Sequence, residues 1–187
     1  MNRIAKDKRS RLVQAAATLS HERGLGKVAL ADIALSANVP LGNVYYYFKT
    51  KDALAEAVIA ERHREFLELQ QVWEQRPSPK ERLKAFVKMT VDSRKVLARA
   101  GCPVGSLCAE LGKEQGALGE AVALPFRELL TWIEAQFAAL GQGRKRRTLA
   151  VHLLSALQGV SLLANCFRDP TLVLREAEQL NAWIDSF

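Results

Sequence analysis

The sequence predicts an all-α fold. Apolar residues recur at helical spacing along the whole 187-residue chain, and no segment competes with the two-residue alternation of a strand. Segments rich in glycine or proline separate the predicted helices, and they are Gly24, 77–79, 101–105 and 141–143. We therefore expect helices throughout, joined by short connections.

The expected helices are placed in order by these breaks. The first covers about 8–23, two short ones lie within 31–48, and a long one covers about 51–75. Ser78 and Glu81 form a capping-box pattern with proline at the first helical position, so a new helix starts there and runs to about residue 100. The remaining predicted helices cover about 106–113, 117–140 with a kink or break at Pro125, 145–167, and a last one opened by Asp169 and Pro170.

Residues 31–51 carry the most information about function. Ile33 and Ala34 face inward on a first short helix, Val39 fills the turn, and Val44 with Phe48 gives the second helix one apolar stripe. A helix with a buried back and a polar, aromatic and basic front is typical of a helix-turn-helix reader of double-stranded DNA. The residues expected to contact DNA are Arg9, Leu41, Gly42, Asn43, Tyr45, Tyr46, Tyr47, Lys49 and Lys51.

The pattern Val39-Pro40-x-Gly42-x-Val44-Tyr45-Tyr46-x-Phe48-x-x-Lys51-x-x-Leu54, preceded by Asp32-Ile33-Ala34, resembles the DNA-binding end of the TetR/AcrR family of bacterial repressors. Where that family has a capping Thr or Ser this chain has Leu30, a loss that costs on the order of 1 kcal/mol. The common His before the Phe is Tyr47, which can still donate to a phosphate.

Charge is concentrated in the same segment. Residues 1–51 contain nine basic and three acidic residues, an excess of six in a total net charge of +7. A basic excess confined to the helix-turn-helix region is expected for phosphate binding, although a basic tail alone would also be explained as solvated charge.

We expect two domains, a DNA-binding domain at 1–51 and a helical ligand-binding and dimerisation domain at 52–187. A module of about fifty residues buries little apolar surface by itself, so it must pack against residues later in the chain.

The helix at 145–167 has two apolar faces, which suggests two packing partners. One can be the same chain and the other a second protomer, although a helix inside a single-chain core is also apolar on most sides. The resemblance implies that the last two helices form a four-helix dimer interface. The expected interface residues are Leu153, Ala156, Val160, Leu163, Phe167 and Trp183.

The large near-neutral C-terminal region favours a pocket for a small-molecule effector. Bulky inward residues are more often plain core, and the candidates for the pocket are Phe86, Met89, Cys102, Val104, Leu107, Phe126, Leu130 and Gln158. Cys102 precedes a helix, where the dipole can favour a thiolate, and similar segments in part of the family sense electrophiles or oxidants. The usual role of a free cysteine is a small buried filler, which is the alternative for Cys102, and Cys166, in the apolar stripe, is expected to be inert.

No catalytic, cofactor or metal-binding motif is present, so neither an enzyme nor a cofactor is expected. No apolar run suggests a membrane span or signal segment, and we expect a cytoplasmic protein. The sequence predicts a sequence-specific DNA-binding regulator, a homodimeric repressor released from a palindromic operator by a small, in one version electrophilic, molecule. The alternatives are a ligand-independent architectural DNA-binding protein and a redox sensor acting through Cys102.

Overall fold

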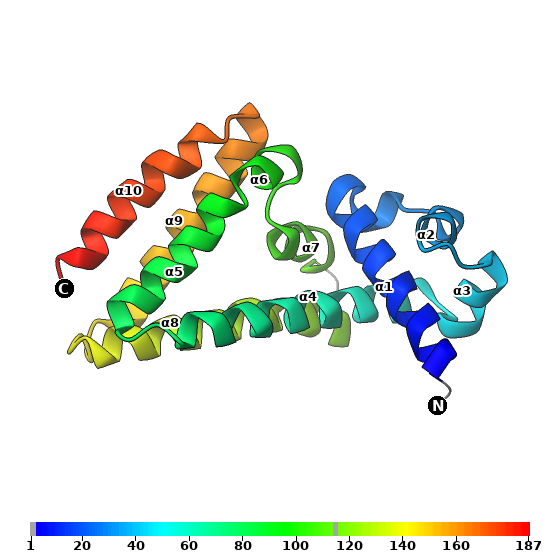
Figure 1. The fold of residues 1–187 in the computed structure, drawn as a ribbon, viewed down its shortest axis with the longest axis horizontal. Coiled ribbons are helices and arrows are strands. Elements are labelled where there is room, and N and C mark those ends of the chain that lie inside the picture. Colours follow the sequence, from blue (N-terminus) through cyan, green and yellow to red (C-terminus); the bar gives the residue numbers. More distant parts are fainter. Residues whose placement is uncertain (1–2, 114–115) are drawn as a thin grey trace. The chain divides into compact units, whose positions relative to one another are not determined.

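The structure, a computed structural model, describes residues 3–113 and 116–187, with side chains from Asp7 onward. Within these residues the regular elements are helices, so the all-α prediction is confirmed (Figure 1). They are α1 (Arg3–Arg23), the 3-10 helix η1 (Leu25–Lys27), α2 (Leu30–Ser36), α3 (Leu41–Tyr47), α4 (Lys51–Glu74), α5 (Pro79–Asp92), α6 (Arg94–Ala100), α7 (Pro103–Leu111), α8 (Ala117–Ala139), α9 (Arg146–Phe167) and α10 (Thr171–Asp185).

The chain divides into two compact units, and each contains pieces that are distant in sequence. The first unit is Met1–Glu65 with Pro103–Leu124, and the second is Phe66–Cys102 with Pro125–Phe187. This division does not coincide with a boundary between residues 51 and 52. α4 and α8 are each shared between the units, and the division in α8 falls at Pro125, where the helix continues despite the missing backbone donor.

The first unit has an aliphatic core. The predicted inward residues Ile33, Ala34, Val39, Val44 and Phe48 are all buried in it. Side chains from outside the helix-turn-helix complete this core, namely Leu54 and Val58 of α4, Leu107 of α7 and Val122 of α8. The expectation that the small N-terminal module must pack against later residues is confirmed, and α7 is one of the elements it packs against.

The second unit has an aromatic core. The Trp73 ring at the end of α4 lies 5.2 Å from Phe86 of α5 and 5.3 Å from Trp132 of α8, measured between ring centroids. Glu74 accepts a hydrogen bond from the Trp132 indole N–H and forms an ion pair with Arg82 at 3.2 Å. α9 and α10 pack together, α10 also packs on α5, and α6 packs on α9 (Figure 1).

The predicted cap at Ser78 is present, and the helix that follows it is shorter than expected. Ser78 Oγ accepts from the Glu81 backbone N–H at 3.3 Å, as the capping-box pattern predicts. The helix expected to run to residue 100 is divided at Ser93 into α5 and α6, without a glycine or proline at the break. The Arg94 guanidinium donates to the Val91 carbonyl there, at 3.0 Å, and gives that carbonyl a partner outside the regular helical pattern.

The sequence predicts Asp169 as the N-cap of the last helix, but α10 begins at Thr171 and its N-cap is Pro170. Asp169 still binds the first residue of the helix. Its Oδ1 accepts from the backbone N–H of Thr171 at 2.8 Å and from the Thr171 hydroxyl at 2.7 Å. These hydrogen bonds stabilise the ionised carboxylate, and they hold the pKa of Asp169 below its usual value.

α9 corrects one expectation from the sequence, because it is long and apolar enough to cross a membrane by length and composition. The core helix of a globular protein meets the same criterion. Here one side of α9 is covered by its own chain, through Ala150, Leu153, Leu157 and Ala164, while about a third of its most apolar stretch is buried overall.

Candidate nucleic-acid interface

The helix-turn-helix begins without a side-chain cap. Ala29 is extended and precedes α2, and its carbonyl accepts from the N–H groups of Asp32 and Ile33 at 3.1 and 3.2 Å. Because alanine has no polar side chain, the first-turn donors depend on other partners, and Asp32 places a carboxylate near the positive end of the helix. The expected weak start of α2 is therefore present, with Leu30 as its first residue rather than its cap.

The turn between α2 and α3 is fixed by a residue outside it. Asn38 adopts a left-handed conformation with φ of 50°, which lets the chain reverse direction. Arg11 of α1 donates to the carbonyl of Asn38 at 2.8 Å and to that of Ala37. Arg11 therefore positions the turn, a role that sequence reasoning missed because it depends on a contact between residues 26 and 27 positions apart.

The outward face of α3 presents large side chains to solvent. Tyr45 is 55% and Tyr46 71% exposed, and Leu41 on the same helix is also exposed. Nothing lies within 4 Å of the position a Cβ would take on Gly42, so the helix surface is open at that residue. Asn43 is half-buried beside it.

Tyr47 differs from the expectation that it faces outward. It is half-buried and packs against the core of the first unit, and its ring meets the edge of Tyr46 with 5.0 Å between centroids. The helical period explains this, because Tyr47 follows Val44 by three residues and shares its inward side. Tyr46, adjacent to it, is the more exposed of the two side chains.

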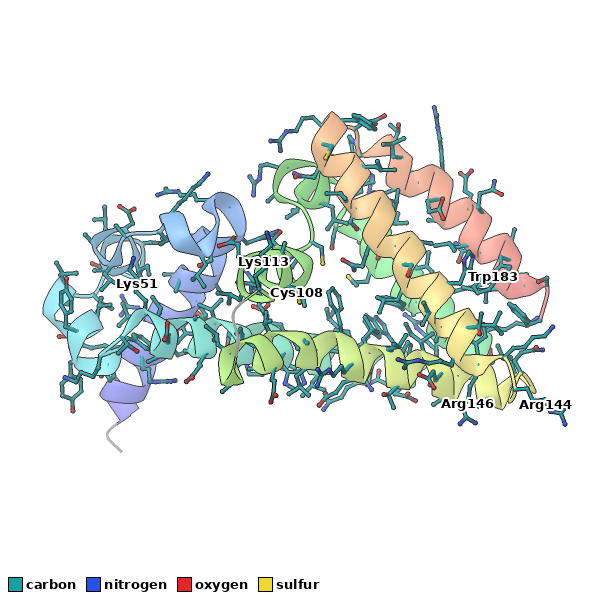
Figure 2. The ribbon with its side chains drawn as sticks, turned by 180° about the vertical axis from the view of Figure 1, so that it is seen from behind. Lys51, Cys108, Lys113, Arg144, Arg146 and Trp183 are labelled. Atoms are coloured by element: carbon teal, nitrogen blue, oxygen red, sulfur yellow. The ribbon has the colours of Figure 1, made fainter. Side chains whose placement is uncertain are left out.

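Basic side chains surround these aromatics. Lys49 Nζ lies 5.9 Å from the centre of the Tyr46 ring, and the Arg9 guanidinium lies 5.5 Å from that of Phe48. Lys51 is exposed on the first turn of α4 (Figure 2), a helix that Thr50 caps by accepting from the Ala53 N–H at 3.1 Å. Such cation–π contacts hold flexible cations near the ring faces.

We call Leu41, Tyr45, Tyr46, Lys49 and Lys51 the α3 patch. Residues 33–51 contain no acidic residue, so the patch has only positive charge. Lysines can pair with phosphates, while a short helix with an open side at Gly42 can approach base edges in a major groove. The α3 patch therefore has the exposure and charge expected of a surface that binds duplex DNA.

The predicted effector residues are divided between the two units. Phe86 is buried in the aromatic core, and Met89, Phe126 and Leu130 are partly buried against the same core. Leu107 is buried in the aliphatic core of the first unit. Val104 and Gln158, on α7 and α9, are half-buried. Their assembly into one pocket stays a prediction.

The three cysteine side chains, all in the described part of the chain, form no disulfide. Cys102 is half-buried between Gly101 and the start of α7, and Cys108 Sγ donates to the Val122 carbonyl at 3.3 Å (Figure 2). Cys166 is exposed, which corrects its expected place inside an apolar stripe, so burial does not protect this thiol in the single chain. A sensing role for Cys102 stays a prediction.

The predicted interface residues on α9 and α10 differ in how far their own chain covers them. Leu153 is completely buried within its own chain and cannot contact a partner, so that assignment is wrong. Trp183 packs against Phe137, His152 and Phe187 with ring centroids about 5 Å apart. Phe167, by contrast, is 67% exposed.

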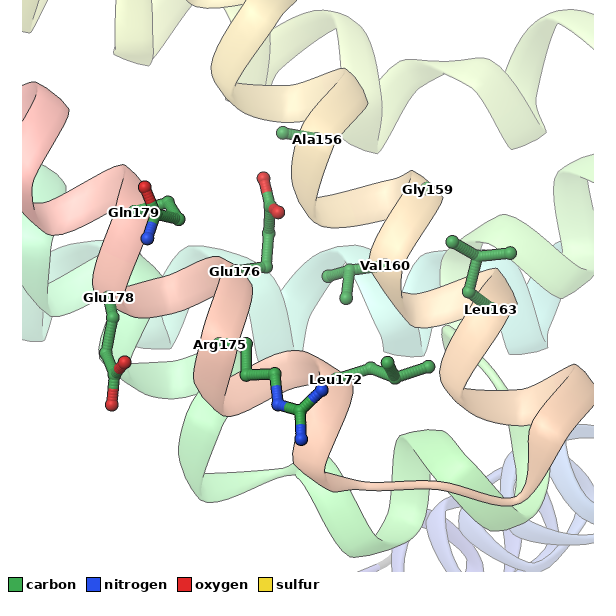
Figure 3. A pocket seen from close by; sticks show the side chains of 9 residues that line it. All are labelled: Ala156, Gly159, Val160, Leu163, Leu172, Arg175, Glu176, Glu178 and Gln179. Atoms are coloured by element: carbon green, nitrogen blue, oxygen red, sulfur yellow. The ribbon is translucent and has the colours of Figure 1, made fainter.

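A groove of about 560 Å³ lies between α9 and α10 (Figure 3). Ala156, Val160 and Leu163 line it from α9, and Leu172 and Glu176 line it from α10. Three exposed or half-exposed residues of α9 line this groove, Ala156, Gly159 and Leu163, and Leu162 and Phe167 are exposed elsewhere on the same helix. We call these five residues the α9 patch.

Comparison with known proteins agrees with this geometry. Residues 12–58 match the family model of bacterial regulatory proteins, tetR family. The chain is 31% identical over 185 residues to the HTH-type transcriptional regulator MT0206 of Mycobacterium tuberculosis. This alignment covers 92% of this chain and 93% of that protein. It is 37% identical over 81 residues, 41% of this chain and 38% of the other, to the HTH-type transcriptional repressor KstR2 of Mycolicibacterium smegmatis.

A solved structure shows the same fold across the whole chain. The TetR transcriptional regulator from Legionella pneumophila superimposes with a TM-score of 0.83 at 20% identity, covering 100% of this chain and 97% of that one. The fold, the helix-turn-helix match and the full-length similarity to a regulator lead to one conclusion. The chain is a DNA-binding transcriptional regulator of the TetR family.

Proposed function

We propose that the protein is a repressor that binds a palindromic operator as a homodimer and leaves it when a small molecule binds. The observation that carries the proposal is the α3 patch, in which exposed aromatic residues and lysines lie together on and beside the second helix of a helix-turn-helix. The name of the relative KstR2 includes repression, which supports this sign of regulation.

A dimer is favoured because seven-residue α3 reads few base pairs by itself. The α9 patch supplies a surface for a second copy, since Leu162 is 63% and Phe167 67% exposed on a helix without a charged residue between 148 and 167. Ala156 and Gly159 allow close approach of a second helix. A two-fold axis would place the same patch on both sides of the interface.

The effector would act by changing the distance between the two α3 helices. Half-sites on one face of the duplex lie about 34–36 Å apart, and a dimer with another spacing contacts only one of them well. A ligand can cause this change only if it binds the two spacings with different affinity. Operator binding in a bacterial cell also requires the protein to be in the cytoplasm.

Selection from a random duplex library tests the proposal. Wild-type protein should enrich an inverted repeat whose half-site centres are about 10 base pairs apart. A matched variant with Lys49→Ala and Lys51→Ala should enrich little, because it lacks two phosphate contacts. Recovery of no preferred sequence, or of equal amounts of DNA with both proteins, would contradict the proposal.

A further inference from the structure

A second pocket lies entirely within the first unit, beside the starts of α2 and α4. Its volume is about 390 Å³, in the range of pockets that hold small organic ligands. It is lined from η1 and the segment after it, the starts of α2 and α4, the end of α7 and the start of α8. The lining residues are Leu25, Gly26, Val28, Leu30, Lys51, Asp52, Leu54, Ala55, Glu110, Leu111 and Leu118.

The pocket has apolar walls and a charged edge. Six of its lining residues are leucine or valine, which suits an apolar body. The charged residues among the described lining are Lys51, Asp52 and Glu110. The ligand class therefore depends on how these three charges are used.

The carboxylate of Glu110 is held in place at this edge. Its Oε2 accepts from the Gly26 backbone N–H at 3.2 Å, which connects α7 to η1. Gly24 has φ of +87°, and a Cβ there would lie 3.1 Å from Glu110 Oε1. Glycine at this position therefore leaves room for the carboxylate.

The charges favour a cationic ligand. Lys51 belongs to the α3 patch and has a phosphate as its proposed partner, whereas the carboxylates of Asp52 and Glu110 would repel a phosphate. We propose that this pocket binds a small apolar molecule with an ammonium group, which the two carboxylates recognise. The site is distinct from the effector pocket proposed above and goes beyond that function.

Occupancy of this pocket would be coupled to DNA binding by position. Leu30 is the first residue of α2 and Lys51 the first of α4, so an occupant contacts the two helices that flank α3 in sequence. A ligand ammonium beside Lys51 would also repel it.

Methyl NMR of the full chain without DNA tests binding directly, because the walls are leucine and valine. With labelled leucine and valine methyls, 2-phenylethylamine should shift the signals of Val28, Leu54 and Leu111. 3-Phenylpropanoate, similar in shape but negative, should bind at least tenfold more weakly. Equal binding of both probes, stronger binding of the carboxylate, or shifts confined to leucines of the second unit would overturn the proposal.

Variants test the recognition of charge. Asp52→Asn with Glu110→Gln should reduce the preference for the amine to about one, and both side chains are exposed, so the fold should tolerate the change. Glu56→Gln is the control. Glu56 lies on α4, as Asp52 does, but outside the pocket, so this variant should keep the full preference for the amine. A preference that survives the double variant would also overturn the proposal. Since no operator is involved, failure here leaves the proposed repressor function untouched.

Discussion

The α3 patch and the α9 patch both expose large apolar side chains, and they differ in what surrounds them. Tyr45 and Tyr46 lie within nineteen residues, 33–51, that contain two lysines and no acid. Leu163 and Phe167 lie in a stretch, 148–167, with no lysine, arginine or carboxylate. Exposed apolar surface alone indicates an interaction site. The charge around it indicates the kind of partner: a basic surface suits a polyanion, and an uncharged surface suits another protein.

The cores beneath the two patches differ in a related way. The first unit is built from small aliphatic side chains around Phe48, whereas the second contains Trp73, Phe86, Trp132 and Phe137. Large rings bury more apolar area per residue, so the second unit has an extensive core of its own. The first unit completes its core with Leu107 of α7 and Val122 of α8, and α7 contacts α1 and η1 there.

A charge introduced into the α9 patch should have the largest effect on dimerisation and on operator affinity. Leu163→Glu places a charge in the proposed dry interface, at a cost of several kcal/mol unless it is paired. The variant should sediment as a monomer, and its operator affinity should fall by about a hundredfold or more, since 1.4 kcal/mol corresponds to about tenfold. Leu69→Glu, at an exposed leucine of α4, is the control and should stay dimeric. A dimeric Leu163→Glu protein would place the interface elsewhere.

Removing one cation from the α3 patch should weaken binding to every DNA sequence alike. Lys51→Ala should reduce the slope of log affinity against log salt by about one, because one phosphate contact is lost. Lys95→Ala, at an exposed lysine of the second unit, should leave the slope unchanged. Fluorescence anisotropy at several salt concentrations measures both. An unaltered slope in Lys51→Ala would exclude this residue from the contacts.

Replacing Asn43, which we expect to contact a base edge, should affect one base pair only. The Asn43 amide offers a donor and an acceptor to a base edge, and its loss should reduce discrimination at that position by about 1–3 kcal/mol. Affinities for operator duplexes with single-base changes, compared between wild type and Asn43→Ala, reveal the affected position. If all preferences survive, Asn43 supports the helix and does not read DNA.

The smallest effect is expected at the turn that holds α10 beside the α9 patch. Hydrogen bonds from Thr171 lower the pKa of Asp169, so its stabilising contribution is fully present above the unfolded value near 3.8 and is lost as the pH falls through the lower folded value. Asp169→Ala should lower Tm slightly at pH 7, and the difference from wild type should shrink as the pH approaches 3. A difference that is constant with pH would assign the effect to packing instead of ionisation.

Local features were predictable from the sequence and non-local ones were not. Val44, Phe48 and the Ser78 cap depend on neighbours within one or two turns, and their predicted burial and bonding are confirmed. Leu153 was misassigned because both faces of α9 are apolar, and periodicity cannot tell which face its own chain covers. The role of Arg11 and the inclusion of α7 in the first unit depend on contacts across many residues. The break at Ser93 has no glycine or proline signal.

The stoichiometry on DNA tests the central claim most directly, because it requires both patches to act as assigned. Sedimentation equilibrium of wild-type protein, alone and with a duplex carrying the selected inverted repeat, gives both masses. We predict twice the chain mass of 20.7 kDa for the free protein, and two chains on one duplex in the complex. A free monomer, or one chain bound per duplex with full affinity, would contradict the account.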